Sequence, residues 1–567
     1  MKTKHILSIF MLTISMLIVS CEQVLDKENL ESINPGLVWN DPVAVNAFLN
    51  QIYLAVLPDF PHEGGYSDEA VGRSQLLPQL KGTANIDTWK NYWNYVNIRQ
   101  INFLFENIGA GTYENETKKV IKGQAYFLRA WEYFKMVKAY GGVPLVLKVQ
   151  NADEGDALNI PRNKTSECIA QIVADLDSAI ANVPESYGDA DLGRIDKIAA
   201  KAFKGRVLLY YASPQFNPSN DAARWQNTYK ANKDALDAAL AGGKGLYENF
   251  KDIWYVDLNK EWIFYKRYKA PSVVNDQMGF RPAIYIVNDF GWDWPSLDLV
   301  NAFPLKDGSA YNPTVAGYDT LWRNRDDRFY ASIAYNGSDF GIKDLVDRNK
   351  YLWTYHQEDK PDPNQEAMQI WSVSSFYRNK GIDKSVDGGN SRKATSPNID
   401  IRFAEVLLNF GEAANEIGKS SEALDALYQV RARAGILPGA GSKYGITAAS
   451  KDDIRNAYIK ERQVEFAFED KRWWDVRRWR RFDLFNSLVN RHGLFITKKN
   501  PPFPEAKEDI NLIYKQFVSH IVKTDGEEKF NILDKYYFYP LSKEELERNP
   551  NLKQTNGWDA GGFDPLN

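Results

Sequence analysis

Apolar side chains recur every three or four positions along two separate stretches of the chain. In the first stretch, residues 87–243, one such run predicts the buried face of an amphipathic helix: Ile121, Ala125, Leu128, Trp131 and Phe134. Gly141 and Gly142 end this helix, and Pro144 prevents it from resuming. The same spacing predicts further helices over residues 166–182, 195–211 and 224–241.

The second stretch, residues 398–481, predicts a helical hairpin. Its helices, over 401–416 and 420–434, are separated at Gly418. Small side chains lie where the two helices approach closely: Gly411, Ala414 and Ala423. The hairpin is about 34 residues long, the length of one tetratricopeptide (TPR) unit, although no full repeat motif is present. We therefore expect degenerate TPR-like hairpins.

Between these stretches, residues 247–397 are rich in Gly, Pro, Asn, Asp and aromatic side chains, with short strand-like pieces such as 283–287. A segment of this length is not a single loop of a compact domain. The sequence predicts a mainly α fold, in which TPR-like hairpins form a scaffold for a loop-rich, aromatic-rich subdomain with short strands. Residues 59–85 have the same loop-like character, and exposed loops on a rigid scaffold usually carry binding residues.

The N-terminus resembles a bacterial lipoprotein signal. Lys2 and Lys4 precede an apolar run, residues 6–19, that is too short to span a bilayer and fits a secretory signal. It ends at Ser20 and Cys21, where a small residue before the cysteine allows cleavage and the thiol can carry a lipid. Such a chain is anchored to the membrane and does not span it. We expect these parts: signal peptide 1–20, lipidated tether 21–34, N-terminal helical part 35–246, loop-rich ligand-side region 247–397 and C-terminal helical part 398–567.

Composition narrows the class of protein further. Hydrophobic residues make up 44% of the chain and charged residues 25%, which is typical of a globular protein, and the formal net charge is −4. No basic patch indicates a nucleic-acid partner. Cys168, the other cysteine, lies on a helical apolar stripe and is expected to be a buried small hydrophobic residue.

The sequence contains few signs of catalysis or cofactor binding. Neither a His-Glu-x-x-His pair nor a Gly-x-Ser-x-Gly elbow is present, so we expect no enzyme and no cofactor. A glycosidase needs two carboxylates across a cleft, and no short motif indicates such a pair. Asp383, Asp387 and Asn390 could together bind a structural Ca²⁺ ion, although their spacing is not that of an EF-hand.

Charged residues are densest between residues 461 and 479. On one continuous helix, Glu461, Glu465 and Glu469 would share a face, and Arg472 and Arg477 follow. These residues allow an acid/base site, or an arginine–carboxylate network that joins helices. We favour the structural network, because cations and anions are balanced and aromatic residues separate them.

Aromatic residues make up 13% of the chain, and those in loop-like sequence are candidates for stacking on a ligand. Trp292 and Trp294 flank Asp293 between Gly and Pro residues, and Trp89 and Trp93 are predicted to begin a helix. The polar candidates are Asp68, Glu69 and Arg73. The alternative for all four tryptophans is packing in the core.

Several blocks, in order over residues 21–567, resemble the SusD/RagB family of nutrient-uptake lipoproteins. The blocks are Ala125–Trp131 with Tyr140–Leu145, Asp400–Asn409, Val430–Gly435, Glu461–Arg478 and Tyr539–Trp558. The resemblance implies a TPR-containing fold and a lipid-anchored protein on the exterior of the outer membrane. It also implies capture of a glycan for a SusC-like TonB-dependent β-barrel transporter.

These blocks belong to the scaffold, so the resemblance assigns no ligand-binding residue. Two other functions stay open: a RagB-like subunit that binds peptide, and a surface glycoside hydrolase. A shallow platform of exposed Trp and Tyr would favour glycan, and a deep cavity of mixed polarity would favour peptide. A carboxylate pair in a deep cleft would favour the hydrolase.

Overall fold

The computed structural model describes residues 35–72, 76–277, 280, 293–313, 320–341, 351–355, 373–386, 388–498 and 517–567. The predicted signal peptide, Cys21, the tether and the strand-like piece 283–287 lie outside these residues. Helices dominate, and the strands are short and paired in twos. The expected mainly α fold is therefore confirmed.

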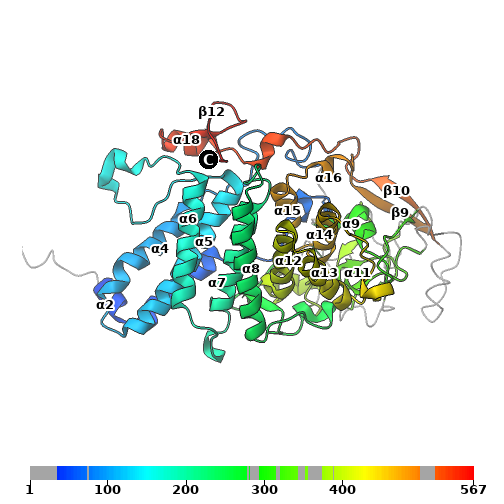
Figure 1. Ribbon diagram of the computed structural model, residues 1–567, viewed down its shortest axis with the longest axis horizontal. Helices are drawn as coiled ribbons and strands as arrows, with labels where there is room; N and C mark the ends of the chain where they lie inside the picture. The colour runs from blue at the N-terminus through cyan, green and yellow to red at the C-terminus, as the bar shows by residue number, and fades with distance from the viewer. Residues whose placement is uncertain are drawn as a thin grey trace, which may run out of the picture.

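The helices stand side by side in one array, which runs in Figure 1 from α4 through α8 to α14. The first part of the array comprises α2 (Pro35–Asn40), α3 (Pro42–Val56), α4 (Tyr95–Asn107), α5 (Asn115–Tyr140), α6 (Thr165–Asn182), α7 (Lys197–Ala212) and α8 (Ala222–Ala241). The second comprises α12 (Phe403–Glu416), α13 (Ser420–Arg433), α14 (Lys451–Glu465) and α15 (Arg472–Arg478). Because α8 packs against α12, the two predicted helical regions form one continuous scaffold.

The predicted helix ends are correct to within about two residues. Helix α5 ends at Tyr140, where Gly141 adopts a φ of 78°, and Gly418 separates α12 from α13 with a φ of 83°. A glycine adopts this left-handed conformation without steric cost. The start of α12 differs from the prediction, because Ile401 belongs to a strand, β8 (Asn398–Arg402).

Strands and short helices make up the loop-rich side of the scaffold. β8 pairs antiparallel with β2 (Trp262–Lys266), and a longer hairpin joins β9 (His492–Lys498) to β10 (Phe517–Lys523). The remaining pairs are β1 (Ala70–Val71) with β3 (Trp294–Pro295), β4 (Ile333–Ala334) with β7 (Tyr377–Arg378), β5 (Ser338–Asp339) with β6 (Tyr351–Leu352), and β11 (Gln554–Thr555) with β12 (Gly561–Phe563). The short helices are α9 (Leu297–Ala302), α11 (Asp327–Ser332), α16 (Asp483–Asn486) and α18 (Lys543–Arg548).

One apolar core extends through the scaffold. It contains buried side chains from both helical regions and from β2, such as Phe127, Phe264 and Leu408. Cys168 is fully buried within this core, as its helical stripe predicts. Smaller clusters lie under the loop-rich side, including one around Trp294 and Tyr377.

Candidate functional site

The predicted tryptophan platform is wrong where the structure describes it. Trp294 is fully buried, because β3 pairs with β1 and carries its indole ring into the interior beside Tyr377. Asp293 is buried as well, and its Oδ1 accepts a hydrogen bond of 3.2 Å from the backbone N–H of Gly65. Neither side chain can stack on or bind a ligand at the surface. Trp292 lies outside the described residues.

The predicted polar candidates have structural partners. The Asp68 carboxylate is buried and accepts two hydrogen bonds from the Arg472 guanidinium, of 2.9 and 2.8 Å. Glu69 is also buried, and burial raises the pKa of its carboxyl well above the usual range. Asp68 is therefore committed to Arg472 and is not free for a ligand. Arg73 lies outside the described residues.

Trp89 and Trp93 lie before α4 and do not begin it, because the helix starts at Tyr95. Both rings are half-buried against the core. Trp89 packs against the rings of Tyr536, Tyr539 and Trp558, and Trp93 packs against Tyr95 and Tyr140. Core packing is thus the better interpretation of this pair.

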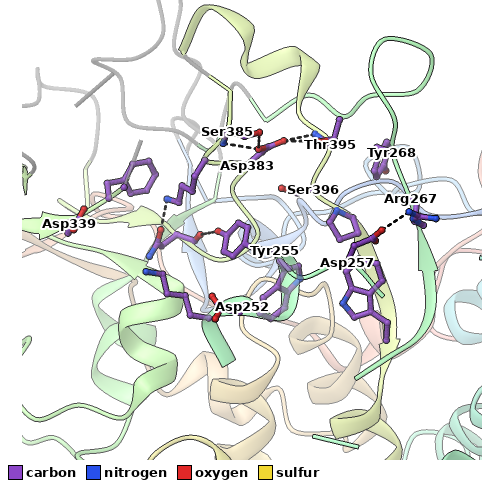
Figure 2. A pocket seen from close by; sticks show the side chains of 18 residues that line it. Asp252, Tyr255, Asp257, Arg267, Tyr268, Asp339, Asp383, Ser385, Thr395 and Ser396 are labelled. Atoms are coloured by element: carbon purple, nitrogen blue, oxygen red, sulfur yellow. Dashed lines mark hydrogen bonds and ion pairs between the residues drawn. The ribbon is translucent and has the colours of Figure 1, made fainter. Parts of the chain in front are cut away.

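A cavity of about 680 Å³ lies on the loop-rich side, within the predicted ligand-side region, and of the residues named from the sequence it is lined by Asp383. Its wall is formed by η5 (Phe250–Trp254) and the turn that follows it, by β2 and the residues that follow it, and by residues 339–341, 379–385 and 395–397. In the view of Figure 2, Tyr255 lies between Asp383, on one side of the cavity, and Asp252, on the other. This volume is within the range of small-molecule sites.

Tyr255 is the most exposed aromatic residue in the cavity wall. Its side chain is 39% exposed, whereas Trp254 and Trp262 are buried. The Tyr255 hydroxyl donates a hydrogen bond of 2.9 Å to the carbonyl of Ile382, which fixes the orientation of the ring. Tyr268, at the other end of the wall, is half-buried. A sugar ring or an apolar side chain can therefore pack against Tyr255.

Charged groups of both signs surround this ring. Arg267 pairs with Asp257 at 2.5 Å, and both side chains are largely exposed. Lys384 donates to the Asn379 side chain at 2.6 Å, and its ammonium lies 3.3 Å from the centroid of the Phe340 ring. The cavity is consequently of mixed polarity, and these polar groups can hydrogen-bond to a ligand.

Asp383 does not resemble a general acid in this setting. Burial raises the pKa of its carboxyl, but hydrogen bonds from Ser385 and Thr395 outweigh this effect, so the pKa lies below the usual range. A general acid needs the opposite shift. Asp387 lies outside the described residues, within which no cluster of three or more His, Cys, Asp or Glu side chains is arranged to hold a metal ion. The structure therefore does not test the Ca²⁺ site that the sequence leaves open, because Asp387 is one of its three residues.

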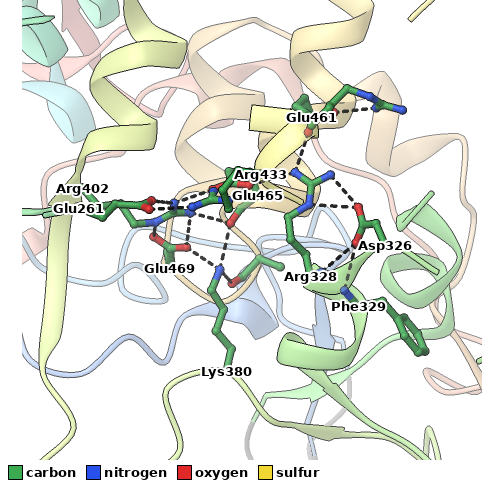
Figure 3. Close-up of polar contacts among 12 residues, drawn as sticks. Glu261, Asp326, Arg328, Phe329, Lys380, Arg402, Arg433, Glu461, Glu465 and Glu469 are labelled. Atoms are coloured by element: carbon green, nitrogen blue, oxygen red, sulfur yellow. Dashed lines mark hydrogen bonds and ion pairs between the residues drawn. The ribbon is translucent and has the colours of Figure 1, made fainter. Parts of the chain in front are cut away.

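The charged residues near α14 form a buried network, shown in Figure 3. Arg402 contacts the carboxylates of Glu261, Glu465 and Glu469 at 2.6, 2.6 and 2.9 Å. Arg328 contacts Glu465 at 3.0 Å and also binds Asp326 and Glu461. Burial raises the pKa of Glu465, but the surrounding arginines outweigh it and hold the pKa below the usual range. These contacts support the structural interpretation of the network.

Two details of this network differ from the sequence prediction. Helix α14 ends at Glu465, so Glu469 lies in the following turn, where Phe468 has a φ of 59°. Arg477 donates to the carbonyls of Lys138 and Tyr537 and so has no role in neutralising the glutamates. A helical periodicity cannot show where such a turn begins.

The cavity was missed because its wall is assembled from five separate segments. The sequence indicated the region, residues 247–397, and Asp383, but for the aromatic face of the cavity its only local sign was the pair Trp254–Tyr255. No helix in the described parts of the chain is long and apolar enough to cross a membrane.

Comparisons with known proteins agree with this architecture. The family model described as "SusD family" matches residues 260–558, and a second, described as "Starch-binding associating with outer membrane", matches residues 62–209. The chain therefore belongs to the SusD family. It is 27% identical to "SusD-like protein P2" of Formosa agariphila over 486 residues. This alignment covers 82% of this chain and 78% of that protein.

Solved structures show the same fold. A SusD-like protein from Bacteroides fragilis aligns with a TM-score of 0.73 at 27% identity and covers 92% of this chain and 98% of that one. A second structure from this organism, described as a SusD-like carbohydrate-binding protein, aligns with a TM-score of 0.70 at 22% identity, covering 91% of this chain and 100% of that one.

Proposed function

We propose that this protein is a non-catalytic lipoprotein that captures oligosaccharide or polysaccharide at the cavity around Tyr255. The family and the carbohydrate-binding description of one structural neighbour support a glycan ligand. The lipobox-like sequence before Cys21 and the outer-membrane description of the second family model support attachment to the exterior of the outer membrane. A SusC-like TonB-dependent transporter would then receive the bound glycan.

The exposed ring of Tyr255 is the observation that carries the glycan proposal. A pyranose presents a face of C–H groups that packs on an aromatic ring, while its hydroxyl groups bind polar side chains around the ring. The hydrogen bond from Tyr255 to Ile382 holds the ring in place before a ligand arrives, which lowers the entropy cost of binding. Asp257, Arg267 and Lys384 offer the surrounding hydrogen-bonding groups.

A peptide is the second candidate, because the cavity is lined by ionisable groups of both signs. Lys251, Arg267 and Lys384 supply positive charge, and Asp252, Asp257 and Asp339 supply negative charge. A neutral glycan has no need of this charge pattern, whereas a peptide carries both signs itself. The lowered pKa of Asp383 does not suit the general acid that the third alternative, a glycoside hydrolase, requires.

The test is a binding screen of the protein without its signal peptide. Affinity electrophoresis and calorimetry against starch, laminarin and other polysaccharides should show binding, and mixed peptide libraries should not. Tyr255→Ala should weaken glycan binding about five- to tenfold, if loss of one stacked ring costs on the order of 1 kcal/mol. The matched control is Tyr428→Ala, since Tyr428 packs against Tyr444 outside the cavity.

Three outcomes would contradict parts of the proposal. If the protein binds peptide and Tyr255→Ala weakens that binding, the ligand of this cavity is a peptide, the second candidate. Glycan binding that Tyr255→Ala leaves unchanged would place the glycan elsewhere on the protein. Release of reducing sugar from a bound polysaccharide would show that the protein is an enzyme.

A further inference from the structure

A second cavity, of about 360 Å³, lies between the helical scaffold and the segment that precedes α15. Its inner wall includes Lys138, near the end of α5, and Trp474, on α15. Exposed residues stand at its edge, among them Asp59, Lys90 and Asn91. The cavity is large enough for a small molecule and is open to solvent at this edge.

Lys138 differs from the other cations of this cavity. Lys90 is paired with Glu63, Lys135 with Glu132 at 2.8 Å, and Lys471 with Glu405 at 3.1 Å. Arg206 is paired with Asp400 and Glu405, both at 2.6 Å. By contrast, the Lys138 ammonium makes no hydrogen bond and no ion pair within the described chain; it lies 3.9 Å from the centroid of the Trp474 ring.

Lys138 is half-buried, and its ammonium has lost part of its water without gaining a counter-charge, which is unfavourable. An oxyanion that enters the cavity would supply that counter-charge through a charge-assisted hydrogen bond. We propose that this cavity binds a small oxyanion, a carboxylate or a sulfate group, at the Nζ atom of Lys138. The proposal does not rest on glycan binding at Tyr255.

Asp470 faces the same cavity and gives the site a pH dependence. Its carboxylate accepts hydrogen bonds from the backbone N–H groups of His62 and Glu63, at 3.2 and 2.7 Å. Burial, together with the negative charges of Glu63 and Asp293, raises the pKa of Asp470 to about 7. Burial also lowers the pKa of Lys138 to about 7.

The remaining charged groups in the wall balance one another. The carboxylates of Asp59, Glu63, Asp400 and Glu469 oppose the four cations other than Lys138, and His62 also lies in the wall. Below pH 7, Lys138 is charged and Asp470 is protonated; above pH 7, Lys138 is neutral and Asp470 is charged. The charge of the cavity thus becomes more negative as the pH rises, and both changes weaken the binding of an anion.

The experiment measures binding of sodium glucuronate, sodium sulfate and uncharged glucose by calorimetry at pH 6 and pH 8, at constant ionic strength. Glucuronate or sulfate should bind at pH 6 and about tenfold or more weakly at pH 8, since titration of a single group with a pKa near 7 already produces that change. Glucose should not bind at this cavity. Binding of sulfate alone would identify a free inorganic ion as the ligand, and binding of glucuronate would identify an acidic sugar.

Variants connect the binding to Lys138. Lys138→Met should abolish anion binding, whereas Lys119→Met, on the same helix but outside the cavity and paired with Glu116, should leave it within twofold of the wild type. Lys138→Arg keeps the charge and should bind at pH 8 more tightly than the wild type does. Absence of anion binding at pH 6 in the wild type, or full affinity in a folded Lys138→Met variant, would overturn the proposal.

Discussion

The guanidinium of Arg472 and the carboxylate of Asp68 form a buried, two-pronged ion pair between residues 404 positions apart in the sequence. Arg472 begins α15, and Asp68 lies just before β1 in the N-terminal loop segment. The pair therefore joins the second helical region to the loop-rich side. Sequence reasoning assigned Asp68 to the ligand and paired Arg472 with the glutamates of α14; the structure corrects both assignments.

Arg472→Ala should lower the free energy of unfolding by about 3–5 kcal/mol, because it leaves the buried Asp68 carboxylate without its counter-charge. The measurement is chemical denaturation monitored by circular dichroism. The control is Arg481→Ala, which removes an ion pair with Asp483 whose partners are 35% and 62% exposed and should cost less than about 1 kcal/mol. Equal effects of the two substitutions would show that the Asp68–Arg472 pair contributes no more than a surface contact.

Gly411→Ala should destabilise the hairpin of α12 and α13. A β-carbon at position 411 would collide with the Tyr458 hydroxyl and lie 2.7 Å from the Cβ of Ala426. Overpacking of this kind costs about 1–3 kcal/mol. Gly109→Ala is the matched control, because a β-carbon there meets no atom within 4 Å. Melting curves measure both; an unchanged melting temperature for Gly411→Ala would mean that the helices separate at little cost.

The scaffold could be predicted because the spacing of apolar residues in the sequence shows which face of each helix is buried. The stripe through Leu128 and Trp131 and the stop at Gly141 are local features, and each corresponds to a helix or a helix end in the structure. The residues in the wall of the proposed binding cavity could not be predicted in this way. Trp294 was assigned to an exposed loop because the two-residue pairing of β1 with β3 leaves no periodic pattern. Tyr255 shares its cavity with residues from about 130 positions further along, and only the fold brings them together.

Stability should depend on pH through His492, on β9. Its Nδ1 lies 2.9 Å from Asp298 Oδ1, and this hydrogen bond raises the pKa of the imidazole above its usual value. A pKa raised by folding stabilises the protein fully below the unfolded pKa, and that stabilisation disappears as the pH rises through the folded pKa. His492→Gln should thus cost more at pH 5.5 than at pH 8.5, by about 0.2–1 kcal/mol for a partly exposed pair.

Urea denaturation of both proteins at the two pH values measures this difference. His520→Gln provides the comparison, since His520 lies on the neighbouring strand β10 and packs against Phe495. A pH-independent cost of His492→Gln would show that the imidazole contributes by packing alone.

Cys21→Ala should release the protein from the outer membrane. The apolar run before Ser20 is the expected export signal, and the Cys21 thiol is the expected site of the lipid. An acyl anchor contributes about 0.8 kcal/mol for each buried CH₂ group, so loss of the lipid should remove most of the attraction to the membrane. Metabolic labelling with radioactive palmitate should therefore label the wild type and not the variant. Cys168→Ala is the matched control, because that thiol is buried in the core and should not affect labelling. If Cys21→Ala still fractionates with the outer membrane and is still cleaved after residue 20, the anchor is not the cysteine lipid.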